Sequence, residues 1–309
     1  MSGTAIRTFD RSAVAAALPM GELISALRDE FAGESDVPAR HHHRVSESDT
    51  TLLLMPAWRR GEHIGVKLVN VEPGNAVLGL PAVQAAYLLA DYRTGRWLAL
   101  MDGNELTARR TAAASALAAS YLARLDASTL LVVGAGRVAS LLAEAHSAVR
   151  PIRRVLVWAR RPEAARQLAA DLVRSGFPAS AAADLPGAVT EADIVSCATL
   201  SAEPIIHGEW LRPGTHLDLI GSFKPDMRES DEETVRRASV FVDTEEAVST
   251  SGDLCGLGIE PLGTLAALCA GTVAGRRSAA ELTLFKSVGY ALEDLVAAEL
   301  VAARISLEI

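Results

Sequence analysis

Short apolar runs typical of buried strands recur through the second half of the chain, separated by segments with helical periodicity. The runs lie near residues 129–133, 154–158, 193–197, 215–220 and 239–243. Between the earlier runs, apolar residues recur at intervals of three and four, as on the buried side of a helix. Strands that alternate with helices predict a doubly wound parallel sheet, an α/β fold of the Rossmann type.

The residues before this region have a different pattern, which predicts helices and antiparallel strands. Positions 19–31 carry apolar residues on one side of a helix, whereas 51–55 and 63–71 have the pattern of strands. The runs 85–91 and 97–101 flank a turn and predict a hairpin. This first part is long enough to form a domain of its own.

Two more helices are expected at the ends of these regions. Thr107 is of a residue type that caps helices, and the alanine-rich stretch after it predicts a long helix to about Ala123. A helical pattern from Ser287 to Arg304 closes the chain.

The run 129–133 ends in a glycine-rich turn, Gly134-Ala135-Gly136-Arg137-Val138-Ala139, and a helical pattern follows. A dinucleotide pyrophosphate needs this order: one glycine for the tight turn, a second for close approach of the backbone, and a small residue where helix and strand pack. An ordinary turn between strand and helix is the alternative. The strand before and the helix after favour a nicotinamide or flavin cofactor, held by Gly134, Gly136, Arg137 and Val138.

The next run ends in Trp158-Ala159-Arg160-Arg161, without the carboxylate that usually binds the ribose of NAD. Two guanidinium groups suit a 2′-phosphate. We therefore expect Arg160 and Arg161 to select NADPH over NADH; the alternative is that one or both arginines are solvated at the start of a helix. Thr199 lies after the run 193–197, at the strand end where such folds bind ligands.

Composition narrows the function classes. The chain has 309 residues and a net charge of −8, which argues against a nucleic-acid partner. No apolar run is long enough to cross a membrane, and no cleavable signal is recognised. The three cysteines form no metal pattern, so a cytoplasmic protein is expected.

The run His41-His42-His43 does not fit a metal site well. Successive side chains of an extended segment point to opposite faces, so the three rings cannot easily share one ion. A polar substrate pocket and a solvated loop both remain possible places for them.

Two charged residues stand in apolar surroundings. Lys67 shares a strand face with Val69 and Val71, so its ammonium is expected to point inward, as in a functional site. A lysine at a sheet edge that extends to water is the alternative. Arg110 would lie in the first turn of the helix after Thr107, where the helix dipole disfavours a cation unless an anion binds there.

A local pair of that guanidinium with Asp102 or Glu105 would also remove this objection, and the spacing does not choose between the two.

Several strings together resemble the ornithine cyclodeaminase/mu-crystallin family. They occur in the family's order along nearly the whole chain: Pro38-Ala39-Arg40, Leu54-Met55-Pro56, Gly65-Val66-Lys67, Pro73-Gly74-Asn75, Leu106-Thr107 with Arg110-Thr111-Ala112, the glycine turn, Asp218-Leu219-Ile220-Gly221, and Phe285-Lys286-Ser287-Val288-Gly289 with Glu293-Asp294. The resemblance implies a Rossmann domain at 123–287, and a domain of 1–122 with 288–309 that binds substrate and forms a homodimer.

The same resemblance assigns roles to individual residues. Arg40 and Arg110 match the arginines that bind the substrate carboxylate, and Lys67 matches the site lysine. Val288 and Gly289 match the string near the nicotinamide, and Ser222 is a further cofactor candidate.

Departures from the family pattern argue against a cyclodeaminase. Phe223 and Leu53 stand where those enzymes carry carboxylates. The string 221–229 and the histidines after Arg40, His42 among them, resemble the ketimine reductases of the family, which reduce Δ1-pyrroline-2-carboxylate and Δ1-piperideine-2-carboxylate. An alanine dehydrogenase of the same family and a binding protein without turnover are the alternatives.

The residues then predict a mechanism for a small cyclic imino acid. The two arginines would hold its carboxylate, and the apolar ring would pack against Phe223. Burial next to guanidinium groups should lower the pKa of Lys67, which would donate a proton to the imine or a hydrogen bond to the carboxylate.

Overall fold

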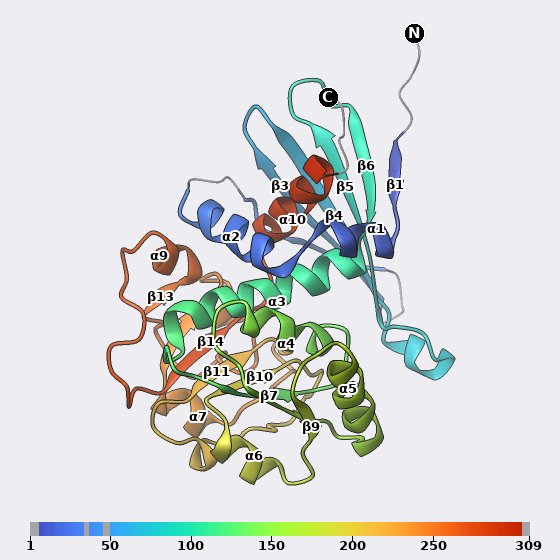
Figure 1. The fold of residues 1–309 in the computed structure, drawn as a ribbon. Coiled ribbons are helices and arrows are strands. Elements are labelled where there is room, and N and C mark those ends of the chain that lie inside the picture. The colour runs from blue at the N-terminus through green and yellow to red at the C-terminus, as the bar shows by residue number, and fades with distance from the viewer. Residues whose placement is uncertain (1–5, 34–36, 46–49, 305–309) are drawn as a thin grey trace. The chain divides into compact units, whose positions relative to one another are not determined.

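The computed structural model describes residues 6–33, 37–45 and 50–304. The chain forms two compact units, here called unit 1 (Met1–Arg110 with Tyr290–Ile309) and unit 2 (Thr111–Gly289). The long helix α3 (Gly103–Leu122) runs from one unit into the other (Figure 1). The units therefore divide inside this helix, whereas the boundary expected from the sequence lies at its end.

Unit 1 is built on a six-stranded mixed sheet. Neighbouring strands are antiparallel except at one edge, where the first strand pairs in parallel. The spatial order is β1 (Arg7–Phe9), β6 (Trp97–Asp102), β5 (Val83–Asp91), β4 (His63–Val71), β3 (Thr51–Arg59) and β2 (His41–Arg44). The expected hairpin is confirmed as β5 and β6, and the 3-10 helix η1 (Pro73–Leu78) lies between β4 and β5.

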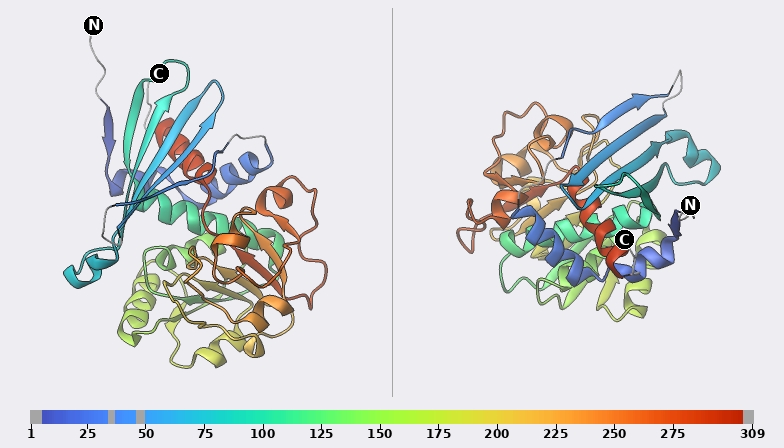
Figure 2. Two further views of the ribbon diagram at one scale, coloured as in Figure 1. Left: turned by 180° about the vertical axis from the view of Figure 1, so that it is seen from behind. Right: turned by 90° about the horizontal axis from the view of Figure 1, so that it is seen from above.

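Alternation along β4 sets one face of this sheet against helices. Every second residue from Gly65 to Val71 is buried, as the sequence predicted. Helix α10 (Ala291–Arg304) contacts β3, β4 and α2 (Met20–Phe31), and Figure 2 shows it beside the sheet from two directions. A short helix α1 (Arg11–Ala17) precedes α2.

Three boundaries in unit 1 differ from the predictions. Strand β3 does not end at Pro56 but continues to Arg59; the edge strand β2 pairs only with residues 51–54, so the missing proline N–H costs no bond to it. Helix α10 begins at Ala291, later than the Ser287 predicted.

The third is the start of α3. The helix begins at Gly103, because Asp102 Oδ1 accepts a hydrogen bond from the Glu105 N–H at 2.7 Å and caps it. Thr107 is therefore inside the helix and is not the cap. Asn104 fits in the first turn because its side chain accepts a bond from the Ala85 N–H.

Unit 2 contains an eight-stranded sheet in which every pair is parallel, which confirms the doubly wound α/β fold. The order is β13 (Gly263–Thr264), β12 (Ser239–Val242), β14 (Thr283–Lys286), β11 (His216–Leu219), β10 (Ile194–Cys197), β7 (Thr129–Val133), β8 (Arg154–Trp158) and β9 (Ala179–Ala181). The chain lays down β8 and β9 on one side of β7 and the later strands on the other.

The remaining elements of unit 2 are helical. They are α4 (Ala139–Ser147), α5 (Pro162–Arg174), α6 (Leu185–Glu191), α7 (Glu232–Arg237), α8 (Ala247–Thr250), α9 (Leu265–Cys269) and the 3-10 helix η2 (Gly208–Trp210).

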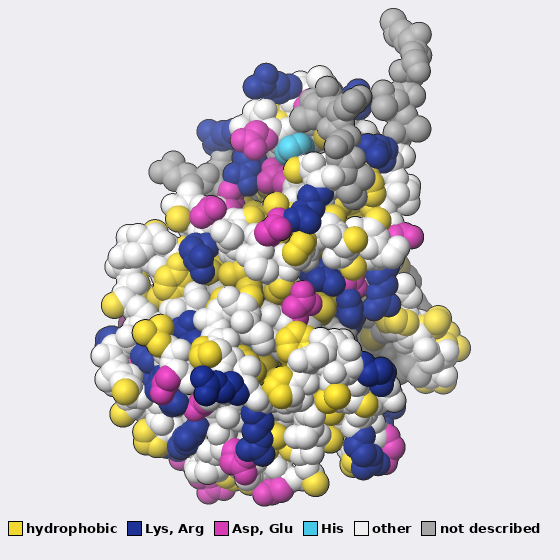
Figure 3. Space-filling view, viewed as in Figure 1, with side chains coloured by type: hydrophobic (Ala, Val, Ile, Leu, Met, Phe, Trp, Pro, Cys, Tyr) yellow, Lys and Arg dark blue, Asp and Glu magenta, His cyan; other side chains and the backbone are white. Residues whose placement is uncertain are grey.

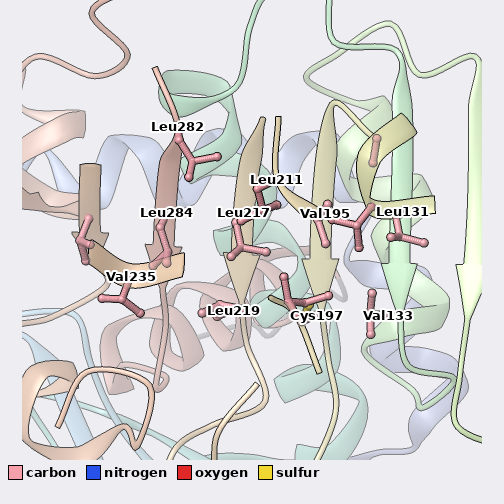
Figure 4. Packing of buried hydrophobic residues seen from close by; sticks show 14 of the residues in the cluster. Leu131, Val133, Val195, Cys197, Leu211, Leu217, Leu219, Val235, Leu282 and Leu284 are labelled. Carbon is pink, nitrogen blue, oxygen red and sulfur yellow. The ribbon is translucent and has the colours of Figure 1, made fainter. Parts of the chain in front are cut away.

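Paired strands place apolar side chains in rows across this sheet. Leu131, Val195, Leu217 and Leu284 are opposite one another on four neighbouring strands, and all are buried (Figure 4). Strand β14, in the middle of the sheet, was missed by the sequence prediction because its four residues begin with a threonine and end with a lysine.

Among the described helices, none has the length and apolarity to cross a bilayer. On the face drawn in Figure 3, acidic and basic side chains are mixed and do not form one extended basic surface.

Candidate active site

Four buried charged side chains of unit 1 form one cluster. The Lys67 ammonium lies 2.7 Å from Asp294 Oδ2. Arg110 donates from Nε to Asp294 Oδ1 at 2.8 Å and from Nη1 to Glu293 Oε2 at 2.5 Å. Two cations therefore face two carboxylates, as buried charges require.

Three elements position this cluster. Lys67 is on the inner face of β4, and Arg110 is in the second turn of α3. Glu293 and Asp294 are in the first turn of α10, where the helix dipole stabilises negative charge. The sequence predicted that Lys67 and Arg110 are charged groups in apolar surroundings, and both are buried.

The partners of Arg110 are not those considered from the sequence. Asp102 caps α3, and Glu105 pairs with Arg109 and Arg11, so neither local pair exists. The dipole argument for a bound anion was also wrong, since α3 begins one turn earlier than predicted.

The cluster lowers the pKa of Lys67 to about 8, as the sequence predicted. Burial is the main cause and Arg110 adds to it, while Asp294 acts in the opposite direction. For Arg110, burial opposes the charged form, but the two carboxylates hold its pKa above the usual value.

Tyr87 points into the same region from the neighbouring strand. It is opposite Lys67 in the β4–β5 register and fully buried, and its hydroxyl has no hydrogen-bond partner among the described residues. A side chain at Gly65 would overlap this hydroxyl, so the glycine makes room for it. An unsatisfied buried hydroxyl calls for an explanation, and a polar ligand bound beside the charged cluster would supply one.

Arg40 and His42 lie two strands away from Lys67. His42 is exposed in β2 and pairs with Leu53, which pairs in turn with Val69, so His42 is on the sheet face of Lys67. Continuing this register by one residue places the half-buried Arg40 opposite Met55, the partner of Lys67. Two strand spacings are about 10 Å, within reach of a shared small ligand.

A different cluster in unit 1 has residue types that bind metals. Oxygen and nitrogen atoms of Glu62, His63 and Glu299 lie within 4.8 Å of one another. Arg59 forms ion pairs with both glutamates and with Glu30, so a cation of the protein itself already contacts the carboxylates that a metal ion would need.

The glycine turn of unit 2 has the shape that a pyrophosphate requires. Gly134 has φ +122°, and a Cβ there would lie 2.5 Å from the Ala198 carbonyl oxygen. Gly136 is exposed, and a Cβ there would meet nothing within 4 Å. Arg137 and the half-buried Val138 lead directly into α4. The open space above Gly136 at the start of a helix fits a phosphate group.

Both arginines predicted to select NADPH are exposed at the carboxyl end of β8. Arg160 approaches Ser201, with 3.4 Å between Nη2 and Oγ, and Arg161 is the N-cap residue of α5. Their charges therefore face water, next to the edge of the sheet that carries the glycine turn.

The other predicted residues of unit 2 are in loops after strands β11, β14 and β10. The Ser222 hydroxyl is buried and donates to the Met227 carbonyl at 2.6 Å, so it organises its own loop. Phe223 is half-buried against the core of unit 2. Val288 and Gly289 donate their N–H groups to Asp243, and Thr199 donates to Glu229.

The sequence assigned no role to Asp294, Glu293, Glu229 or Lys286, although the strings that contain them carry the family resemblance. A signal was present for three of them: Asp294, Glu293 and Lys286 are charged residues inside or beside apolar runs, whereas Glu229 stands among polar residues. The sequence does not show the partner of each charged residue, because that partner is far away along the chain.

The model of the ornithine cyclodeaminase/mu-crystallin family matches residues 7–308. The chain belongs to this family. The resemblance inferred from the sequence is thereby confirmed.

Individual members of the ornithine cyclodeaminase/mu-crystallin family are similar over most of their length. A Δ1-pyrroline-2-carboxylate reductase of Paracoccus denitrificans is 44% identical, over 82% of this chain and 83% of the relative. The solved structure of the Thermococcus litoralis Δ1-pyrroline-2-carboxylate reductase, in complex with NADH and L-proline, has a TM-score of 0.91 and 35% identity, covering 97% and 98% of the two chains. An archaeal alanine dehydrogenase dimer with bound NAD has a TM-score of 0.89 and 30% identity, covering 97% of each.

Proposed function

We propose that this protein uses NADPH to reduce cyclic ketimine acids, Δ1-pyrroline-2-carboxylate to proline and Δ1-piperideine-2-carboxylate to pipecolate. The observation that carries the proposal is the buried Lys67, whose pKa of about 8 keeps a transferable proton at neutral pH. The relatives named above, two reductases and a dehydrogenase, support the coarser class of a nicotinamide-dependent oxidoreductase.

The substrate carboxylate would bind to the arginines. Arg110 uses Nε and Nη1 for Asp294 and Glu293, and this pairing holds the guanidinium rigid and leaves Nη2 for a ligand. A fixed planar donor orients a carboxylate better than a mobile one. Arg40 would supply the second contact, from the row of residues that contains Lys67.

The proton would come from Lys67. A cyclic imine accepts a hydride well only when its nitrogen is protonated, and reduced nicotinamide supplies that hydride when it is bound. An ammonium with a pKa near 8 is charged at neutral pH and yet gives up its proton more readily than an exposed lysine.

The apolar residues fit a ring better than an open-chain diamine. Leu53 is half-buried and lies on the same face of the sheet as Lys67. It is two residues before Met55, which pairs with Lys67. Phe223 is also half-buried. Neither side chain can bind a second amino group, which an ornithine cyclodeaminase must do, so ring methylenes are the better partner.

The cofactor would bind to unit 2. Gly134, Gly136, Arg137 and Val138 would hold the pyrophosphate, and Arg160 and Arg161 would bind the 2′-phosphate of NADPH. Thr199, Ser222, Val288 and Gly289 are in the segments after the neighbouring strands and would surround the nicotinamide half.

We also propose a homodimer formed through unit 1. The sheet face opposite Lys67 carries half-buried apolar residues on neighbouring strands: Leu52, Leu54, Pro56, Ile64, Val66, Leu68 and Leu88. Near η1, Val77, Leu78 and Leu80 are 91%, 71% and 51% exposed, and yellow side chains mark this segment in Figure 3. Exposed apolar side chains that lie together in this way could be covered by a second subunit. A cytoplasmic location is part of the same proposal.

The deciding experiment measures oxidation of NADPH and of NADH with each cyclic ketimine acid, with pyruvate plus ammonia, and with ornithine. Rapid oxidation with a ketimine acid and a lower KM for NADPH are expected. The structural similarity to an alanine dehydrogenase makes reductive amination the second candidate. Faster oxidation with pyruvate plus ammonia would favour it, and tight NADPH binding without any oxidation would indicate a binding protein.

A further inference from the structure

The segments that follow β10 and β11 lie side by side at the carboxyl edge of the unit 2 sheet. Strand β7, which carries the glycine turn, pairs with β10, and β10 pairs with β11. In a doubly wound sheet a dinucleotide lies across this edge, where the chain switches from one side of the first strand to the other. Thr199 and Gly221, in the two segments, are therefore on the side away from the adenosine end.

One carboxylate, that of Glu229, ties these two segments together. Its Oε1 accepts hydrogen bonds from the N–H and the hydroxyl of Thr199, both at 2.8 Å. Its Oε2 accepts one from the N–H of Gly221 at 2.6 Å. The side chain is completely buried. Three donors from two separate segments thus converge on a single side chain.

Close packing of the backbone adds to this restraint. A Cβ at Gly221 would overlap the Thr199 carbonyl oxygen, so the two segments touch where the carboxylate joins them. Only glycine permits this approach. Glu229 therefore holds the two segments together, and their backbone contact prevents them from coming closer.

A second layer of charged groups holds Glu229 itself. The N–H groups of Glu229 and Ser230 donate to Asp253 Oδ1 at 2.8 and 2.9 Å. Asp253 Oδ2 lies 3.6 Å from the Lys286 ammonium, which donates to the Leu219 carbonyl at 2.9 Å. A buried series of contacts thus runs from β14 through Asp253 to the segments after β10 and β11.

We propose that Glu229 is a positioning residue for the nicotinamide half of the cofactor, because its carboxylate sets the spacing of the Thr199 and Gly221 segments against which that half would lie. The inference rests on the proposed use of a nicotinamide dinucleotide. Because its three donors come from both segments, a change in this carboxylate should alter their spacing as well as the stability of the fold.

The charge of Glu229 gives the proposal a pH dependence. Burial raises the pKa of this carboxyl to about 7; Lys286 opposes the rise and Asp253 adds to it. The thiol of Cys197 also faces these charges, and burial keeps it protonated. Below pH 7 the carboxyl takes up a proton and becomes a weaker acceptor for three donors, so the spacing should loosen.

The test is NADH binding to the full-length protein, measured by nucleotide fluorescence between pH 6 and pH 8. NADH avoids the 2′-phosphate of NADPH, whose own pKa of about 6 would confuse the profile. Glu229→Gln keeps the shape but replaces one acceptor oxygen by a donor. The control is Glu232→Gln, which makes the same chemical change on the exposed side of α7. Amide hydrogen exchange at residues 199 and 221 is measured on the same proteins without cofactor.

We expect wild-type Kd to rise from pH 8 to pH 6, and the Glu229→Gln variant to bind about tenfold more weakly with a flat profile, as loss of a bond to a charged group implies. Exchange at both amides should accelerate in this variant and not in the control. If Glu229→Gln does not fold, Thr199→Val removes one of the three donors and should weaken binding less, in the same direction.

Equal Kd values and parallel pH profiles for wild type and variant would overturn the positioning role while leaving the proposed function intact. If the wild-type protein bound neither NADH nor NADPH, the proposed function would fall as well, so the two failures are distinct.

Discussion

The ammonium of Lys67 and the carboxylate of Asp294 form an ion pair of 2.7 Å between the middle of a strand and the first turn of the last helix. Both side chains are buried. The pair prevents a sharp fall in the pKa of the lysine, which burial and Arg110 alone would produce. Asp294 therefore controls how much of the proton donor is charged at neutral pH.

Replacing Lys67 by alanine should reduce ketimine turnover by orders of magnitude while dinucleotide binding remains. The wild-type protein should lose activity above pH 8, since a pKa of about 8 means that the ammonium is deprotonated above that value. Steady-state kcat/KM for reduction between pH 6 and pH 10 measures this loss, which is the alkaline limb of the pH profile. Turnover by Lys67→Ala at the wild-type rate would remove the lysine from the mechanism.

Asp294→Asn should move that alkaline limb to lower pH, by about one unit or more. The reason is that the negative partner is lost while burial and Arg110 continue to disfavour the ammonium. The variant should also be less stable by about 3 kcal/mol, because two buried cations lose a partner. Glu62→Gln changes an exposed carboxylate of unit 1 and should leave the limb in place. A limb that stays near pH 8 in Asp294→Asn would contradict the role given to this residue.

Compared with the wild-type protein, the Asp218→Asn variant should become more stable as pH rises. Burial raises the pKa of Asp218 to about 7 from 3.8, so the folded state holds this proton more tightly than the unfolded state. The resulting stability is present below pH 4 and is lost as pH rises through 7. Asparagine resembles the protonated acid and does not titrate.

The difference in unfolding free energy between this variant and wild type should therefore change by about 3 kcal/mol between pH 4 and pH 8, in favour of the variant. Urea unfolding at several pH values measures it, with the exposed Asp126→Asn as a control. A comparison with wild type is needed because the buried His146, whose pKa falls to about 3, makes both proteins more stable as pH rises. Taking the difference between the two proteins removes this contribution. A pH-independent difference would show that Asp218 does not titrate in this range.

The sequence predicted what depends on neighbours along the chain. Alternation identified Lys67 as inward-facing, because the side-chain period of a strand is local. The parallel sheet and glycine turn followed from similar patterns. Thr107 was mistaken for a cap because the helix had an earlier capping residue in Asp102, whose use depends on the β5–α3 contact made by Asn104.

Partners across long sequence separations could not be predicted in this way. Nothing near Arg110 indicates that its carboxylates come from α10, and nothing near Thr199 indicates Glu229. The buried Lys286 hid strand β14, because a lysine in a central strand makes sense only with Asp253 beside it. Two of these unpredicted partners have the roles that we propose: Asp294 controls proton transfer, and Glu229 controls the position of the cofactor.

The two glycines of the turn after β7 should respond differently to alanine, because one is restricted by the protein and the other is not. At Gly134 a Cβ would meet the Ala198 carbonyl at 2.5 Å with φ at +122°, so Gly134→Ala should lower the free energy of unfolding by about 2 kcal/mol. At Gly136 a Cβ meets no protein atom within 4 Å, so Gly136→Ala should leave the melting temperature within a degree or two. The same methyl group would stand where the pyrophosphate approaches the backbone, and NADPH and NADH should both bind at least tenfold more weakly. Thermal unfolding and nucleotide titration of the two variants separate the effects, and a Gly136→Ala variant that binds as tightly as wild type would show that the dinucleotide lies elsewhere.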